Sequence, residues 1–375
     1  MAELKIRSLG SFALNVPLVK PEDLSFGRVE RVEYVITRIE AGEFIGYGEA
    51  ATLQGPTWSE ESQETIKSTI DQYLSKTVQN ADTLDYVRIS RLMDDRVKGN
   101  NFAKAAIEMA ILDAACKELN IPVYRLLGAK CRESIPLSWT LANNDVESDV
   151  REAKEYVKKG WRILKIKAGS LPVSSDMERV RSVRNAVGDS VSLRVDANQG
   201  WNINQAMTSL KALEDARVDL LEQPLPKWDL DGLAEVSRRT SIPIMADESL
   251  CSIRDAVSLI EKRAASVFSY KLTKMGGILN CRTVESIADA YRIGGYVGCM
   301  IETSIGTAAY LQFAASMHHL DYGCELFGPL RLEYDPVRKG IEYREGEVLV
   351  PDQPGIGIKV DEERLRKLST KQSRT

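Results

Sequence analysis

Between Pro136 and Phe327 the chain alternates short apolar segments with longer segments whose apolar residues recur at helical spacing. This alternation predicts βα units and a parallel sheet. Eight such units favour a closed barrel, whereas the alternative, an open doubly wound sheet, calls for a Gly-rich first turn that this sequence lacks. The predicted strands are 136–142, 162–168, 191–198, 219–224, 242–249, 266–272, 296–303 and 321–327.

The N-terminal part has a different order, with strands first and helices afterwards. Alternation and helical spacing predict strands at 4–16 and 30–50 and helices at 61–76 and 101–120. Turn-rich sequence predicts loops at Pro17–Arg28 and Thr52–Trp58.

These patterns predict an α/β fold with three parts. Residues 1–125 form an N-terminal α+β capping domain, and residues 126–340 form a modified TIM barrel of the (β/α)7β type. Residues 341–375 form a C-terminal segment that packs back on the capping domain and completes it.

Composition is that of a soluble globular protein. Of 375 residues, 43% are hydrophobic and 28% charged, and the net charge of −4 comes from interspersed acids and bases. We therefore expect no nucleic-acid partner and no membrane surface. The N-terminus lacks the apolar core of a signal peptide, and six cysteines without paired spacing fit free thiols. These features predict a cytoplasmic protein.

Three acidic residues follow three successive apolar strands. Asp196, Glu222 and Asp247 lie about 25 residues apart, one per βα unit, and the C-terminal ends of barrel strands converge on one site. A single Asp at such a place is most often a helix cap, but three in succession fit metal ligands better. Oxygen-only ligation suits Mg²⁺, or Mn²⁺, and disfavours zinc because no His or Cys shares the cluster.

Lysines flank the acids. Lys165 and Lys167 share one face of their strand, and if that face lines the barrel, each ammonium lowers the pKa of the other and provides a neutral amine base. The alternative, two surface lysines, is disfavoured by the apolar flanking residues. Lys271, on the sixth strand, is expected across the mouth from Lys167. A metal on a substrate carboxylate would then stabilise an enediolate while a lysine transfers the proton.

Several segments occur together in a recognisable order: KIKAG, RVDANQGW, LLEQPLP, MADESL and YKLTKMGG, with GYGEA, SWTLAN, CMIETSIGTAA and CELFGPL around them. As a set they resemble the muconate lactonizing enzyme (muconate cycloisomerase) subgroup of the enolase superfamily, over nearly the whole chain. The resemblance implies that Asp196, Glu222 and Asp247 bind the metal. It also implies that Lys167 and Lys271 are the acid/base pair.

The resemblance further implies supporting roles for four residues. Lys165 would tune Lys167 and contact the substrate carboxylate, Asn198 and Glu248 would support the metal ligands, and Glu302 occupies a further polar position on the seventh strand. The related mandelate racemase branch uses a histidine base. The two histidines of this chain, at 318 and 319, fall in a helix-like stretch away from the strand ends, which disfavours that branch.

The substrate is expected to depend on Leu53, Trp58, Glu325 and Phe327. Dipeptide epimerases of this subgroup carry an Asp-x-Asp pair on the eighth strand, whereas this chain has Phe327 in place of the second acid. That difference favours a Mg²⁺-dependent, cycloisomerase-like lactonisation of an unsaturated dicarboxylate. An epimerase or racemase of an amino-acid derivative remains the alternative, because Glu325 would pair with a cationic substrate. A dehydratase and a non-catalytic binding protein are weaker alternatives, and the resemblance suggests a homo-oligomer.

Overall fold

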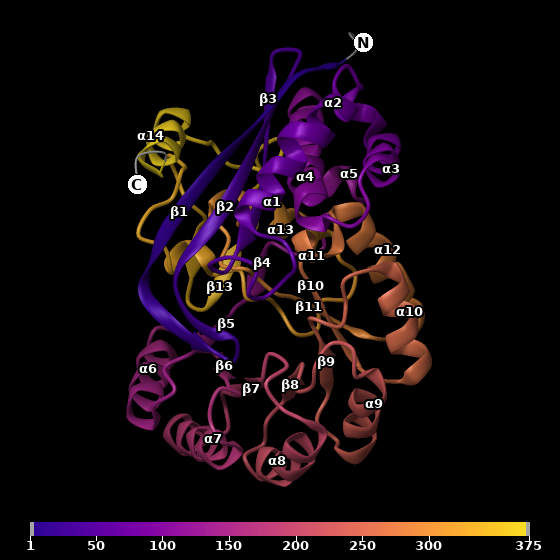
Figure 1. The fold of residues 1–375 in the computed structure, drawn as a ribbon. Coiled ribbons are helices and arrows are strands. Elements are labelled where there is room, and N and C mark those ends of the chain that lie inside the picture. The colour runs from indigo at the N-terminus through magenta and orange to yellow at the C-terminus, as the bar shows by residue number, and fades with distance from the viewer. Residues whose placement is uncertain (1–3, 373–375) are drawn as a thin grey trace.

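The computed structural model describes residues 4–372, which fold as a barrel under a cap (Figure 1). Seven parallel strands form the barrel sheet in the order β11-β10-β9-β8-β7-β6-β5. They are β5 (Ser138–Leu141), β6 (Ile163–Lys167), β7 (Ser192–Asp196), β8 (Leu220–Glu222), β9 (Ile244–Ala246), β10 (Val267–Tyr270) and β11 (Gly294–Val297). The fold class predicted from the sequence is confirmed.

Helices surround this sheet, and α6 to α10 form an arc around the strands in Figure 1. The barrel helices are α6 (Val146–Lys158), α7 (Val173–Val187), α8 (Ile203–Asp215), α9 (Leu230–Arg239), α10 (Ile253–Lys262), α11 (Leu272–Met275), α12 (Ile278–Ala290) and α13 (Ser304–Ser316). Several begin at a side-chain cap of the kind that the turn sequences favour, such as Asn202, which forms a capping box with Gln205. None of the described helices is long and apolar enough to cross a membrane.

The predicted eighth strand, 321–327, is wrong as a full strand. Only Cys324 pairs, and it bridges in parallel to both Leu137 and Val297, the two edges of the sheet. Neighbouring backbone groups add hydrogen bonds to this closure, such as the Glu325 amide, which donates to the Val297 carbonyl over 2.9 Å. The segment cannot extend further because Gly323 has a φ of +67° and a 3-10 turn, Gly328–Leu330, begins shortly afterwards.

The cap contains an antiparallel sheet of β1 (Ile6–Leu24), β2 (Gly27–Ala41) and β3 (Phe44–Thr52). The predicted loop at Pro17–Arg28 is wrong, because β1 and β2 continue through it as a hairpin with a register shift between Pro17 and Glu22. Helix α4 (Asn101–Glu118) packs on β3 at two glycines. A Cβ at Gly46 or Gly48 would lie about 2 Å from a carbonyl oxygen of α4, so this close approach requires glycine.

The other cap helices are short. They are α1 (Gln63–Ser68), α2 (Ser75–Val78), α3 (Tyr86–Arg96) and α5 (Val123–Leu126), with a π-helical segment at Thr69–Leu74 and a 3-10 turn at Thr83–Asp85. The helix predicted at 61–76 therefore contains a π segment, and α3 was not predicted. Helix α4, predicted at 101–120, is confirmed and almost fully buried.

The C-terminal segment contacts both parts. Its hairpin, β12 (Tyr343–Arg344) and β13 (Glu347–Leu349), pairs with β4 (Ser134–Pro136) before the barrel. Helix α14 (Glu362–Gln372) lies beside β1 in the cap (Figure 1), and the Ile356 amide donates to Asp113 of α4 over 2.9 Å. The domain boundaries given by the sequence stay a prediction.

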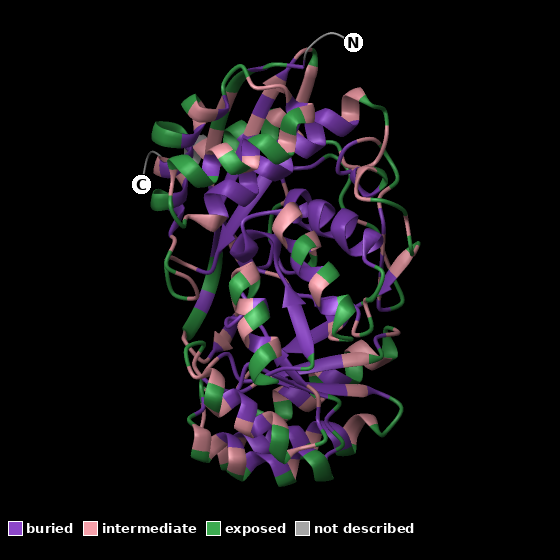
Figure 2. Ribbon diagram, turned by 90° about the vertical axis from the view of Figure 1, so that its right-hand side faces the viewer, coloured by how far each residue is buried: buried purple, intermediate pink, exposed green. Residues whose placement is uncertain are grey.

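Buried carboxylates join the cap to the barrel. Glu49 of β3 accepts from the amides of Thr303 and Gly306 at the start of α13, over 2.9 and 3.1 Å. Glu108 of α4 accepts from the Leu279 amide in the first turn of α12 over 3.1 Å. Buried residues accordingly run from the barrel strands into the cap helices, while exposed residues lie on the outer helix faces (Figure 2).

Candidate active site

Three carboxylates lie at the C-terminal ends of neighbouring strands. Asp196 ends β7 and is level with Glu222 at the end of β8 in the strand register, and Asp247 directly follows β9. Each is at most 1% exposed. The structure thus brings the predicted triad together at the barrel mouth.

Lys165 and Lys167 both face the barrel interior from β6. Lys165 Nζ lies 2.8 Å from Glu222 Oε2 and 3.6 Å from Asp196 Oδ2. Lys167 donates to the same Asp196 oxygen over 2.7 Å. The alternative of a surface lysine pair is therefore excluded, since Lys165 is 1% exposed.

Asp247 is held by two lysines from the segment after β10. Lys271 donates to its Oδ2 over 2.7 Å, and Lys274 donates to its Oδ1 over 2.8 Å. Lys271 was predicted for this site, but Lys274 was not assigned a role. The sequence feature that could have indicated Lys274 is its position three residues after Lys271 in YKLTKMGG. The short helix α11 between them brings both side chains to the same carboxylate.

The lysine pKa values are not depressed as the sequence predicted. Burial lowers the pKa of Lys167, but Asp196, Glu325 and Glu222 together outweigh it and hold the pKa above its ordinary value. Lys165 does lower the pKa of Lys167, as a smaller effect. At Lys271 too, burial lowers the pKa, but Asp247, Glu248 and Glu222 together raise it above its ordinary value. At Lys167, Asp196 has a larger effect on the pKa than the neighbouring Lys165.

The triad fits a hard divalent cation. Burial, together with the charges of Asp196 and Asp247, raises the pKa of Glu222 to about 8. At Asp247, burial acts in the same direction, but Lys271 and Lys274 outweigh it and hold the pKa below its ordinary range. Three buried oxygen donors that repel one another are stabilised by a dication. The donor set contains no His or Cys, so it suits Mg²⁺ or Mn²⁺ better than zinc.

Asn198 and Glu248 connect the triad to the cap. The Asn198 side-chain oxygen accepts from Lys167 over 2.9 Å, and its amide nitrogen donates to Glu248 Oε1 over 3.0 Å. The Trp58 indole donates to the same Glu248 oxygen over 3.1 Å. Glu248 Oε2 has no hydrogen-bond partner within residues 4–372, and burial raises the pKa of Glu248 to about 7. Both predicted supporting residues therefore lie at the site.

A small inner cavity at the mouth is lined by all four residues predicted to set the substrate: Leu53, Trp58, Glu325 and Phe327. Lys271 also lines it, and its Nζ lies 4.2 Å from the Trp58 ring centroid, which fits a cation–π contact. The free volume of this inner cavity is about 30 Å³.

Glu302 does not lie on the seventh strand as predicted. Strand β11 ends at Val297, and Glu302 lies in the loop before α13, where it accepts from the Met300 amide over 2.8 Å. Next to Glu302, Ile301 has a φ of +57°, a left-handed conformation that is unusual for a β-branched residue. Ile301 also lines the inner cavity, which the sequence did not predict.

Glu325 is already paired inside the barrel. Its Oε2 lies 2.6 Å from Lys165 Nζ, and its Oε1 accepts from the Thr140 hydroxyl. Its pKa is below the ordinary value because these partners outweigh burial. The expectation that Glu325 would hold a substrate ammonium group therefore loses support.

Glu22 is a cavity residue that sequence reasoning missed. It lies in the β1–β2 hairpin, is 4% exposed, and reaches the inner cavity. Its Oε1 lies 3.5 Å from Arg331 Nε. No local pattern could indicate this, because the position depends on how the hairpin lies across the mouth.

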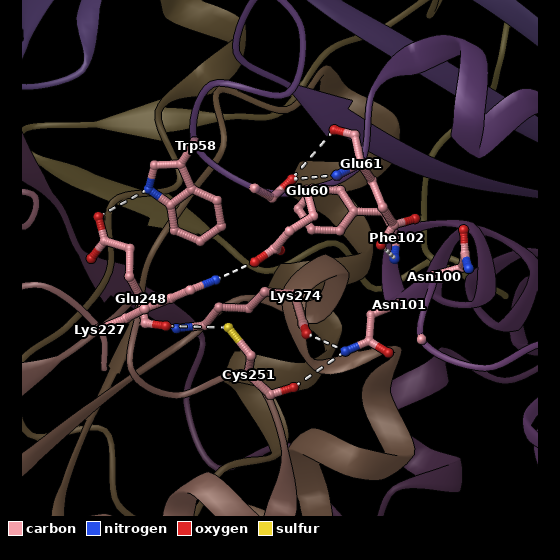
Figure 3. Close-up of a pocket in the computed structure, with 12 residues that line it drawn as sticks. Trp58, Glu60, Glu61, Asn100, Asn101, Phe102, Lys227, Glu248, Cys251 and Lys274 are labelled. Carbon is pink, nitrogen blue, oxygen red and sulfur yellow. Dashed lines mark hydrogen bonds and ion pairs between the residues drawn. The ribbon is translucent and has the colours of Figure 1, made fainter. Parts of the chain in front are cut away.

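A larger outer cavity of about 300 Å³ lies beyond Trp58. Among the residues that the structure describes, only Trp58 lines both cavities. Figure 3 shows the indole turned toward Glu248 and the Lys227 side chain reaching Glu60 of the cap. The indole therefore separates the inner cavity from this outer space.

Comparisons with known proteins agree with this geometry. Residues 148–364 match the family described as enolase C-terminal domain-like, and residues 8–128 match the mandelate racemase / muconate lactonizing enzyme N-terminal domain. A chloromuconate cycloisomerase of Cupriavidus necator is 39% identical over 97% of this chain and 98% of its own length. Muconate cycloisomerase 1 of Acinetobacter baylyi is 34% identical over 96% and 99%.

Solved structures of muconate and chloromuconate cycloisomerases are also similar to this chain. Muconate lactonizing enzyme from Pseudomonas fluorescens, complexed with muconolactone, superimposes with a TM-score of 0.95 at 34% identity, covering 98% of this chain and 99% of the other. For 2-chloromuconate cycloisomerase from Rhodococcus opacus the TM-score is 0.94 at 37% identity, covering 97% and 99%.

The chain therefore belongs to the mandelate racemase/muconate lactonizing enzyme family of the enolase superfamily. Within this family it is a muconate cycloisomerase-like isomerase. Its class of enzyme uses a divalent metal ion and acts on small carboxylates.

Proposed function

We propose that this enzyme lactonises an unsaturated dicarboxylate of the muconate type in the presence of Mg²⁺. The observation that carries the proposal is the inner cavity, in which Lys167 and Lys271 face one space above the carboxylate triad and under Trp58. The resemblance to cycloisomerases over nearly the whole chain supports the same choice.

Asp196, Glu222 and Asp247 would hold the metal, which supplies positive charge for one carboxylate of the substrate. A ligand set of oxygens alone suits Mg²⁺, and Mn²⁺ would fit the same ligands. Lys165 keeps Glu222 and Glu325 in place through its ion pairs to both. Lys167 and Lys271 are the ammonium groups on the wall of the cavity.

The reaction then needs one addition and one proton transfer. An oxygen of the remote carboxylate forms a C–O bond to the far carbon of a C=C bond, and the π electrons move into an enediolate. An ammonium group, from Lys167 or Lys271, delivers a proton to the α-carbon and restores the carboxylate. The lysine regains its proton from solvent, so that no other reactant is consumed.

The cavity wall fits this substrate better than an amino-acid derivative. Phe327 offers an apolar face and Glu325 is occupied by Lys165 and Thr140, so neither would bind a substrate ammonium group. Epimerisation remains a second candidate because it would use the same two lysines.

Turnover in D₂O separates the two activities. With cis,cis-muconate and Mg²⁺, NMR is expected to show a lactone with one deuterium at the carbon next to the carboxylate. An N-acylamino acid or dipeptide should show no α-deuterium exchange. Exchange with inversion of the amino-acid derivative, without any lactone from muconate, would overturn the proposal. A homo-oligomer and a cytoplasmic location also remain predictions.

A further inference from the structure

We propose that Asp289, His318 and His319 form a second metal site, for a transition-metal dication such as Zn²⁺. The site lies away from the mouth. Asp289 is near the end of α12, which leads into the N-terminal end of β11, and the histidines precede the Cys324 bridge. Functional residues of the mouth lie at the opposite strand ends. The two imidazoles are the only ones in the chain.

The three side chains already converge. One ligand atom from each lies within 4.8 Å of the others, and His319 Nε2 is 3.0 Å from Asp289 Oδ1. The rings of His318 and His319 are 4.7 Å apart at 78°. Tetrahedral zinc with bonds of about 2.0 Å needs ligand atoms roughly 3.3 Å apart, so small side-chain rotations suffice. All three side chains are exposed and free to make them.

The two histidines lie on non-helical backbone. The sequence placed both histidines in a helix-like stretch, but α13 ends at Ser316 and they follow it. In a helix, adjacent residues point about 100° apart and do not share a ligand. The non-helical backbone allows both imidazoles to face Asp289.

The backbone that carries the histidines is fixed before any metal binds. The His318 amide donates to Glu285 over 3.0 Å. Arg132 donates to the Met317 carbonyl over 2.8 Å and to the His318 carbonyl over 3.4 Å. Binding would therefore order only side chains, which keeps its entropic cost small.

The surroundings favour a dication of this type. Asp289 and His319 border a surface depression of about 600 Å³, which Asp321 and Arg292 also line. Its two carboxylates and one guanidinium together contribute a net negative charge. Imidazole nitrogen suits Zn²⁺, Ni²⁺ and Cu²⁺ rather than Mg²⁺. This site and the carboxylate triad would therefore take different metals.

The position suggests what the ion does. Cys324 bridges β11 and β5 and so completes the ring of strands. A metal on Asp289 and the two histidines would tie the end of α12 to the segment that leads into Cys324. It would stabilise the closed barrel without touching the reacting groups.

Calorimetric titration of the full-length, Mg²⁺-saturated enzyme with Zn²⁺ tests the site. We expect one Zn²⁺ per chain with a Kd in the micromolar range or below, and a rise in Tm with unchanged turnover. The double variant His318→Asn/His319→Asn should weaken binding at least tenfold and lose the rise in Tm. Asp321→Asn is the matched control, because Asp321 borders the depression but is not a proposed ligand, and it should bind as the wild type does.

Three results would overturn the proposal. The first is Zn²⁺ binding only at millimolar concentration. The second is equal affinity in the double variant, which would place the ion at a cysteine or at the triad. The third is inhibition by Zn²⁺ in step with binding, which would mean that it replaces the catalytic metal.

Discussion

The barrel rim and the cap face the same cavity but are built differently. On the rim, each functional side chain follows a buried strand and is bound by ion pairs, as Lys165 is to Glu222 and Glu325. On the cap side, Trp58 is held to the rim by one hydrogen bond to Glu248 and by contact with Lys271. The reacting groups that we propose therefore lie on the rim, while the cap contributes the side chains that we expect to contact the remote part of the substrate.

The largest expected effect is loss of a metal ligand from the rim. Glu222→Gln should abolish turnover. Substituting a residue that only supports the metal ligands typically lowers metal affinity by roughly 10–100-fold, and Glu222→Gln should weaken Mg²⁺ binding by more than that. Glu248→Gln, in an outer partner, should stay within that range. Calorimetry with Mg²⁺ and Mn²⁺ checks both. Wild-type metal affinity in Glu222→Gln would show that the triad is not the metal site.

Loss of either proposed acid/base lysine comes next. Lys167→Ala and Lys271→Ala should each lower kcat by roughly 10²–10⁴-fold. Metal affinity should be unchanged or higher, because each substitution removes an ammonium group that competes with the metal ion for the carboxylates. Lys227→Ala, on the outer cavity, is the matched control and should keep most of its activity. A variant that loses metal and activity together would indicate a structural role for that lysine.

A smaller effect is expected on the cap side. Trp58→Ala removes a cation–π contact that is worth about 0.5–2 kcal/mol, which corresponds to roughly 2–30-fold in kcat/KM. Trp58→Phe keeps a ring over Lys271 but loses the hydrogen bond to Glu248, so its loss should be smaller. Steady-state kinetics on unsubstituted and chlorinated muconates measure this. Equal kinetics for Trp58→Ala and the wild type would show that the indole does not contribute to catalysis or to substrate selection.

The smallest effect concerns the attachment of cap to barrel and its pH dependence. Burial raises the pKa of Glu49 from 4.5 to about 8, so the folded state binds this proton more tightly than the unfolded chain. The contribution of Glu49 to stability should therefore fall as the pH rises from about 4.5 to about 8.

Thermal unfolding between pH 5 and 8.5 measures this contribution. Glu49→Gln cannot ionise, so its Tm should decline less across the window than that of the wild type. Parallel declines of Tm in the two proteins would mean that Glu49 is ionised throughout.

The sequence predicted the rim well for a physical reason. A buried parallel strand is seen in the sequence as a run of apolar residues. The polar residue at the end of that run lies at the mouth of the barrel, as Asp196 and Glu222 do. Alternation along KIK likewise placed Lys165 and Lys167 on the interior face. These inferences need only local spacing and the symmetry of the barrel.

The parts that the sequence missed depend on contacts between distant segments. The turn-rich segment that carries Glu22 was predicted as a loop, but it is a hairpin that contacts distant segments, through the bridge of Leu18 to Leu332. The eighth strand was reduced to Cys324 by the turn at Gly323. The lysine pKa values were predicted in the wrong direction because the partner carboxylates come from other strands.

A structure of Lys167→Ala with Mn²⁺ and muconate tests the division between rim and cap most directly. We predict that Mn²⁺ binds Asp196, Glu222 and Asp247, with one substrate carboxylate beside it and the remote end against Trp58 and Phe327. Metal elsewhere, or a substrate whose remote end contacts the barrel rim but no cap residue, would contradict the account.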